Sequence, residues 1–171
     1  MFSSNADLRD YNLYDASNLV LPSTSLTSGC FRNMFNRSTG LQYTPKLPAT
    51  ELGIACYSLM FQRASTISSV ILLPATTLAN NCYLQLFQEA YFPKAIEVKF
   101  TSWGTNNSQY TSNWWYGTNG SPNNSLFIKP ESLPISRTTN TMPTGIKILN
   151  RIDGRLYYAE NTGGHSAGDL Y

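Results

Sequence analysis

Apolar and polar positions follow a pattern along this chain that repeats every 26 residues. Leu, Pro, Thr, Leu, Cys and Phe recur at the same six places in three consecutive blocks, without a gap. The blocks are residues 21–46, 47–72 and 73–98. A fixed period of roughly 20 to 50 residues is typical of solenoids, in which each unit buries its apolar face against its neighbours. The pattern therefore predicts three stacked units.

The apolar residues in the first part of each block have a spacing that indicates an α-helix. In the middle block, Leu52, Cys56 and Met60 lie four residues apart, and an aromatic residue follows each of the last two. Such spacing places side chains on one face of a helix. Thr50 precedes this run, where its hydroxyl could cap the free amides of a first turn. We therefore expect helices near 25–36, 51–62 and 77–88.

The second part of each block has the residues of a short strand. Ile67 to Leu73 is rich in β-branched side chains, which favour strands. The expected strands lie near 41–46, 67–72 and 93–99. Stacked units would pair these strands in parallel on one side and line the other side with helices. The predicted fold class is an α/β solenoid, a right-handed leucine-rich repeat with three 26-residue strand-helix units and a C-terminal irregular or β cap.

The chain divides into four segments on this pattern. They are 1–20, a partial repeat or an irregular N-terminal cap; 21–98, the three repeats; 99–150, a closing cap segment; and 151–171, a tail. Met1, Phe2 and Leu8 have the spacing found at Met34, Phe35 and Leu41. Both interpretations of 1–20 stay open, and with them whether the chain is a segment of a longer protein. In the tail, Ile152 to Tyr158 indicates a turn followed by a strand.

The repeat Leu-Pro-Ala-Thr-x-Leu-x-x-x-Cys-Tyr-x-x-Met-Phe resembles that of BspA-like bacterial surface proteins, which carry leucine-rich repeats of the treponemal type. Later segments are similar to the closing segment of that family. They are Phe100–Trp103, Thr111–Trp114, Leu126–Pro130 and Met142–Gly145. The family usually has a second cysteine three residues after the Met-Phe pair, where this chain has Ser38, Ala64 and Ala90. The resemblance implies exposure on a surface, binding of proteins, matrix or glycans, and no chemistry; it also implies that Trp114 packs in the cap.

Composition excludes several classes of partner. Charged residues make up 13% of the chain, the net charge is +2, and Asn, Ser and Thr together number 52 of 171 residues. No basic run resembles a surface that follows a phosphate backbone, so we expect no nucleic acid partner. No apolar run approaches the roughly 20 residues that span a bilayer, so we expect no membrane insertion. Residues 1–5 lack the features of a signal peptide.

Candidate chemistry is sparse. His165 is the single histidine and lies in a glycine-rich stretch, and the carboxylates are scattered. We therefore predict no catalytic residues, no metal site, no cofactor and no enzyme. Cys30, Cys56 and Cys82 are expected to be reduced and buried at the same inward position of successive units, too far apart to be bridged.

Two groups of residues are candidates for binding. The first is the strand face, where the units differ most and where repeat proteins bind partners. Its candidates are Tyr43, Lys46, Ser69, Lys94 and Glu97. The second is the pair Trp115 and Tyr116, aromatic residues in a polar stretch that suit glycan stacking or a protein hot spot. The alternative for the strand face is a simply solvated surface.

Two function classes follow from these observations. The first is a non-enzymatic binding or adhesion module that recognises a protein or glycan and is exposed outside a cell or on its surface. The second is a bacteriophage virion component, a fibre or a receptor-binding or decoration protein built on the same repeat. Oligomers are expected if the chain belongs to a fibre or virion.

Overall fold

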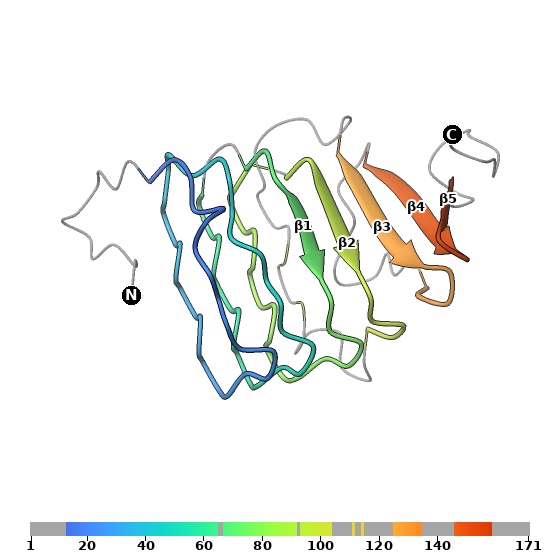
Figure 1. The fold of residues 1–171 in the computed structure, drawn as a ribbon, viewed down its shortest axis with the longest axis horizontal. Helices are drawn as coiled ribbons and strands as arrows, with labels where there is room; N and C mark the ends of the chain where they lie inside the picture. Colours follow the sequence, from blue (N-terminus) through green and yellow to red (C-terminus); the bar gives the residue numbers. More distant parts are fainter. Residues whose placement is uncertain are drawn as a thin grey trace.

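A computed structural model gives the structure of the chain. The residues that it describes are 13–64, 67–91, 93–103, 111, 114, 125–134 and 146–158. The three sequence blocks form three coils that lie side by side, and a β-sheet runs along one wall of the molecule (Figure 1).

The described strands form one five-stranded sheet. They are β1 (Val70–Leu73), β2 (Ala95–Val98), β3 (Leu126–Pro130), β4 (Lys147–Ile152) and β5 (Arg155–Tyr158). Their order in the sheet is their order in the sequence. The first four strands are parallel, and β4 pairs with β5 in antiparallel fashion. The parallel pairing expected between the second and third blocks is thus confirmed for β1 and β2.

The strand expected in the first block is not formed. Near 41–46 the structure has a single parallel bridge, between Asp15 and Tyr43. The turn and strand expected near the C-terminus are present as the hairpin of β4 and β5. Asp153 and Gly154 form its two-residue turn with φ of 47° and 82°, the positive angles that a tight hairpin requires.

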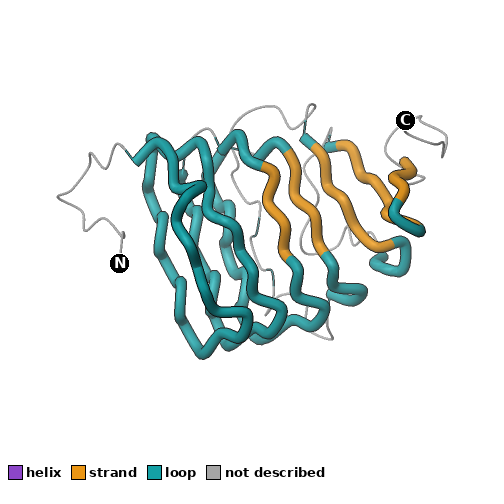
Figure 2. The backbone as a smooth tube through the Cα atoms, in the orientation of Figure 1, coloured by secondary structure: helices purple, strands orange, loops and turns teal. Residues whose placement is uncertain are grey.

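The predicted helices are wrong. None of the described residues is helical (Figure 2). The predicted α/β solenoid of strand-helix units is therefore incorrect, and the described part of the fold is a mixed sheet joined to long runs of turns. Thr50 therefore caps no helix. Its hydroxyl donates instead to the Thr24 carbonyl of the preceding coil, at 3.4 Å.

Backbone hydrogen bonds explain what replaces each helix. The Tyr57 amide donates to the Cys82 carbonyl of the next coil (3.0 Å), whereas the Ser58 amide donates to the Ala55 carbonyl three residues back (3.3 Å). The same alternation runs through residues 55–64 of the second coil and 29–38 of the first. Half of the amides thus close β-turns and the other half join neighbouring coils. We call these segments, with 81–90 of the third coil, the turn side of the molecule.

A left-handed residue recurs at every fourth position of the turn side. In the second coil these residues are Ala55, Leu59 and Arg63, with φ between 54° and 60°. The equivalent residues of the other coils are Gly29, Asn33, Arg37, Asn81, Gln85 and Glu89. The true period is therefore four, which a helix of 3.6 residues per turn matches closely over two turns. This coincidence makes Leu52, Cys56 and Met60 appear helical in the sequence.

Aromatic rings stack in register through the coils. Phe61 lies between Phe35 and Phe87, with ring centroids 5.7 Å apart on both sides and ring planes tilted by 4° and 6°. Tyr57 likewise lies between Phe31 and Tyr83, at 5.8 and 6.1 Å. These columns form the centre of the core.

Trp114 continues both columns. Its ring stacks on Tyr83 at 5.7 Å and on Phe87 at 6.4 Å, and it is fully buried. The amide of Phe87 donates to its carbonyl (3.0 Å). The structural role expected for Trp114 is confirmed.

The cysteines differ between coils. Cys56 and Cys82 are buried and free, as predicted, and burial raises their pKa values to about 11 and about 12. Cys30 is free but exposed, so its predicted burial is wrong. It lies in the first coil, where its Sγ is 3.1 Å from the Thr27 hydroxyl.

Candidate binding surface

The sheet has one face turned to the core and one turned outward. In β1, Ile71 and Leu73 are buried, whereas Val70 and Leu72 are 59% and 44% exposed. We call the face of Val70 and Leu72 the outer face. Residues in register across a parallel sheet share a face, so Ala95, which pairs with Val70, belongs to it.

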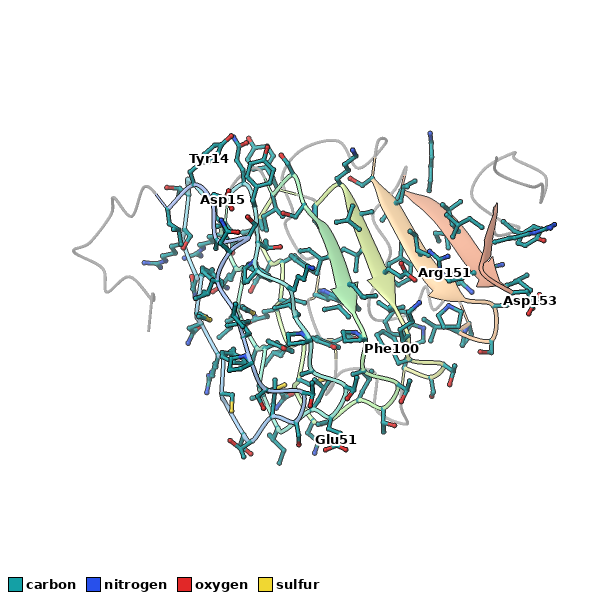
Figure 3. The ribbon with its side chains drawn as sticks, viewed as in Figure 1. Tyr14, Asp15, Glu51, Phe100, Arg151 and Asp153 are labelled. Atoms are coloured by element: carbon teal, nitrogen blue, oxygen red, sulfur yellow. The ribbon has the colours of Figure 1, made fainter. Side chains whose placement is uncertain are left out.

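Four large side chains form an exposed apolar strip on the outer face and its N-terminal extension: Tyr14, Tyr43, Val70 and Leu72. The bridge between residues 15 and 43 brings the two tyrosines together, and their rings meet edge to face at 5.6 Å. They are 52% and 40% exposed. Tyr14 lies on the segment before the first coil (Figure 3).

Backbone contacts place Tyr43 beside β1. The Ser68 amide donates to the Gln42 carbonyl (2.9 Å), so Tyr43 lies next to the segment that leads into β1. The Thr44 amide donates to the Ser69 hydroxyl (2.9 Å), which lies 3.3 Å from the Gln42 carbonyl. Ser69, a predicted binding residue, therefore has its hydroxyl engaged in joining two coils.

Charged side chains occupy the part of the outer face beyond the apolar strip. Arg151 of β4 reaches across β3 and donates two hydrogen bonds to Glu97 of β2, at 2.8 and 3.3 Å. Lys99 donates a further one at 2.5 Å. Burial opposes the ionisation of Glu97, but the hydrogen bonds from Lys99 and Arg151 outweigh it and hold its pKa below the usual value.

Lys94 precedes β2 directly, and Lys147 begins β4; both are exposed. Lys147 is in register with Leu126, which pairs with Ala95. One row of the outer face thus runs from Val70 through Ala95 and Leu126 to Lys147. Lys46, also exposed, follows Tyr43 by three residues.

The structure therefore brings together some of the predicted residues but not all. Tyr43 joins the apolar strip, and Glu97 joins a charged cluster. Lys46 and Lys94 are exposed. Trp115 and Tyr116 lie outside the described residues.

Sequence reasoning missed Tyr14, Val70, Leu72 and Arg151. Tyr14 lies outside the 26-residue period, and the bridge that its neighbour Asp15 makes with Tyr43 follows no repeat. Val70 and Leu72 belong to the uniformly apolar stretch Val-Ile-Leu-Leu, whose sequence gives no sign of the alternation of exposed and buried residues in β1. The partner of Arg151 lies 54 residues away, with no pattern that links them.

Lys129 is a buried cation on β3 with a structural role. Its ammonium group donates to the carbonyls of Leu133 (2.6 Å), Pro130 (3.2 Å) and Glu131 (3.3 Å). Burial lowers its pKa. The three carbonyls belong to the last residue of β3 and the turn that follows it, which this side chain holds closed.

The chain matches no protein-family model, no curated protein and no solved structure. Among the described residues no group of His, Cys, Asp and Glu could hold a metal ion. The same part of the chain contains no helix that could cross a membrane. The outer face is therefore the strongest candidate site that the described residues offer.

Proposed function

We propose that this protein is a non-enzymatic binding module that recognises a partner through its outer face. The observation that supports this most is the apolar strip of Tyr14, Tyr43, Val70 and Leu72. Single exposed apolar side chains are ordinary, but adjacent ones mark interaction surfaces. Tyrosine is also among the residues that contribute most to binding energy at protein interfaces.

The contrast between the two sides of each coil supports the same proposal. Residues on the turn side that face the core repeat from coil to coil, because they stack on one another. The outward residues of the strand side do not repeat: Val70 is in register with Ala95 of the next coil, and Leu72 is in register with Glu97. Variation on a repeated scaffold is how repeat proteins acquire distinct partners.

Of the two ligand classes, a protein fits the strip better than a glycan. Glycan sites combine aromatic rings with polar groups free to bind hydroxyls, whereas Ser69 is engaged within the scaffold. Val70 and Leu72 add aliphatic surface, which suits an apolar side chain of a protein partner.

The proposal includes a location outside a cell or on its surface. The low share of charged residues and the 52 Asn, Ser and Thr residues support it. A bacteriophage particle would favour the same neutral surface. Detection of the chain in purified particles, rather than in a cell-surface fraction, would favour the virion.

The experiment compares the parent with a Tyr43→Ser/Leu72→Ser variant on arrays of cell-surface proteins and glycans. Ile54→Ser is the matched control, since Ile54 is 53% exposed on another part of the second coil. We expect a protein ligand that the parent and the control bind and the double variant loses, with similar thermal melts for all three. Binding that survives in the double variant contradicts the proposal. A glycan ligand that the double variant loses would mean that the partner is a glycan and not a protein.

A further inference from the structure

The outer face has two chemically different parts that lie next to each other. The apolar strip ends at β1, and the strands beyond it carry a cationic region that we define as Lys94, Lys99, Lys147 and Arg151. Among these four cations, Glu97 is the one described carboxylate. Resting on the proposed function, we infer that the partner presents an acidic segment in which an apolar side chain lies beside carboxylates.

Charge complementarity is concentrated where β2 and β4 begin. Lys94 and Lys147 are both exposed there, and neither makes an ion pair with another described residue. Glu131 and Asp153 lie in the turns at the opposite ends of β3 and β4. A carboxylate from a partner would therefore meet two cations, because Glu97 is already paired with Lys99 and Arg151.

The row from Val70 to Lys147 sets the spacing of the partner's residues. It crosses three strand intervals of about 4.8 Å, or roughly 14 Å in total. An extended peptide advances about 3.3 Å per residue. An apolar residue on Val70 and an acidic residue on Lys147 would thus lie about four positions apart.

The middle of this row adds little exposed surface. Ala95 is 3% exposed, between the exposed Val70 and the half-buried Leu126. Contacts with a partner along this row would therefore be made by Val70, Leu126 and Lys147. Nucleic acid would gain nothing from these aliphatic contacts and would need more phosphate-binding cations.

The test uses a displayed library of random twelve-residue peptides, selected on the full chain. We expect enriched peptides with Asp or Glu about four positions from an aliphatic or aromatic residue. Lys94→Glu/Lys147→Glu should weaken these peptides at least ten-fold and should shift selection toward Lys- and Arg-containing peptides. The control is Arg32→Glu/Arg37→Glu, which reverses two exposed charges on the turn side and should leave affinity unchanged.

Other outcomes overturn the inference in distinguishable ways. Peptides that require Tyr43 and Leu72 but show no acidic preference would refute the acidic partner and leave the proposed function standing. Selection of no peptide, or of peptides indifferent to both the apolar strip and the cationic region, would refute the inference. Tight binding of single-stranded DNA to the parent, lost in Lys94→Glu/Lys147→Glu, would assign the cations to nucleic acid.

Discussion

The turn side and the strand side of each coil differ in whether their residues repeat from one coil to the next. On the turn side, Phe35, Phe61 and Phe87 repeat and stack with nearly parallel rings. On the strand side, the outward residues differ from coil to coil, and Tyr43 and Val70 remain exposed. The comparison shows that repetition in this sequence marks the residues that coils bury against each other, and that its absence marks the exposed surface for which we propose a partner.

Hydrogen bonding makes the same distinction. Turn-side polar groups form ladders: Asn36 donates to Gln62 at 3.0 Å, and Gln62 donates to Gln88 at 2.8 Å. The strand side has an ion cluster instead, in which Arg151 and Lys99 meet on Glu97. Each coil adds one step to a ladder, whereas the cluster joins Glu97 of the third block to Arg151, which lies outside the repeat.

Phe61→Ala should give the largest loss. It deletes the middle ring of a column, which costs on the order of 3–5 kcal/mol of unfolding free energy. Denaturant unfolding measures this loss. Ile54→Ala, at a half-exposed position of the same coil, should stay within roughly half a kcal/mol of the parent. Equal losses in the two variants would mean that the column does not hold the coils together.

Gln62→Leu should break the amide ladder at its centre. The variant leaves the buried Gln88 without its donor, and an unsatisfied buried polar group costs about 1–3 kcal/mol. Arg63→Gln, one residue along, removes a half-exposed ion pair with Glu89 and should cost at most about 1 kcal/mol. The prediction fails if Gln62→Leu unfolds at the same denaturant concentration as the parent.

The strand-side cluster should respond to acid. Because the pKa of Glu97 is lowered in the folded state, its ionised form stabilises the fold at neutral pH. That contribution is lost as the pH falls below the usual glutamate range of about 4.3 and through the folded-state pKa. Glu97→Gln should therefore melt below the parent at pH 7, and the difference should shrink toward pH 3. The control is Glu51→Gln, which removes an exposed carboxylate outside the cluster (Figure 3) and should melt with the parent at pH 7.

Ala55→Gly should produce the smallest effect, with the opposite sign. Ala55 has a φ of 54°, where glycine is less strained than alanine, so the variant should gain up to about 1 kcal/mol. Ala79→Gly is the control, because Ala79 is absent from the positive-φ residues and packs against the core. It should lose about 0.5–1 kcal/mol. Melts that shift in the same direction would contradict the left-handed turn geometry.

The sequence predicted how the coils stack better than it predicted their secondary structure. The six recurring columns of the 26-residue blocks correctly placed Phe61 and Cys56 in the core and β1 parallel to β2. They could not distinguish a helix from a run of turns, because Cys56 and Met60 satisfy both periods. The hydrogen bonds that decide between them join residues 25 positions apart, such as Tyr57 and Cys82.

The candidate site was predicted only in part, for a related reason. Tyr43 and Glu97 stood out because the repeat varies at their positions. Tyr14 and Arg151 lie outside the repeat, and their contacts with these residues depend on how the segments before and after it join the coils. A repeat in the sequence identifies contacts that recur in every coil, whereas the contacts of Tyr14 with Tyr43 and of Arg151 with Glu97 each occur once.

One measurement tests the stacked-turn architecture most directly: through-hydrogen-bond scalar couplings between amide nitrogens and carbonyl carbons, recorded by NMR on the deuterated, isotope-labelled chain. The account predicts a coupling from the Leu59 amide to the Leu84 carbonyl, which it meets at 2.9 Å in the next coil. It also predicts one from the Tyr57 amide to the Cys82 carbonyl. A coupling from the Leu59 amide to the Ala55 carbonyl, four residues back, is the signature of an α-helix and would contradict it.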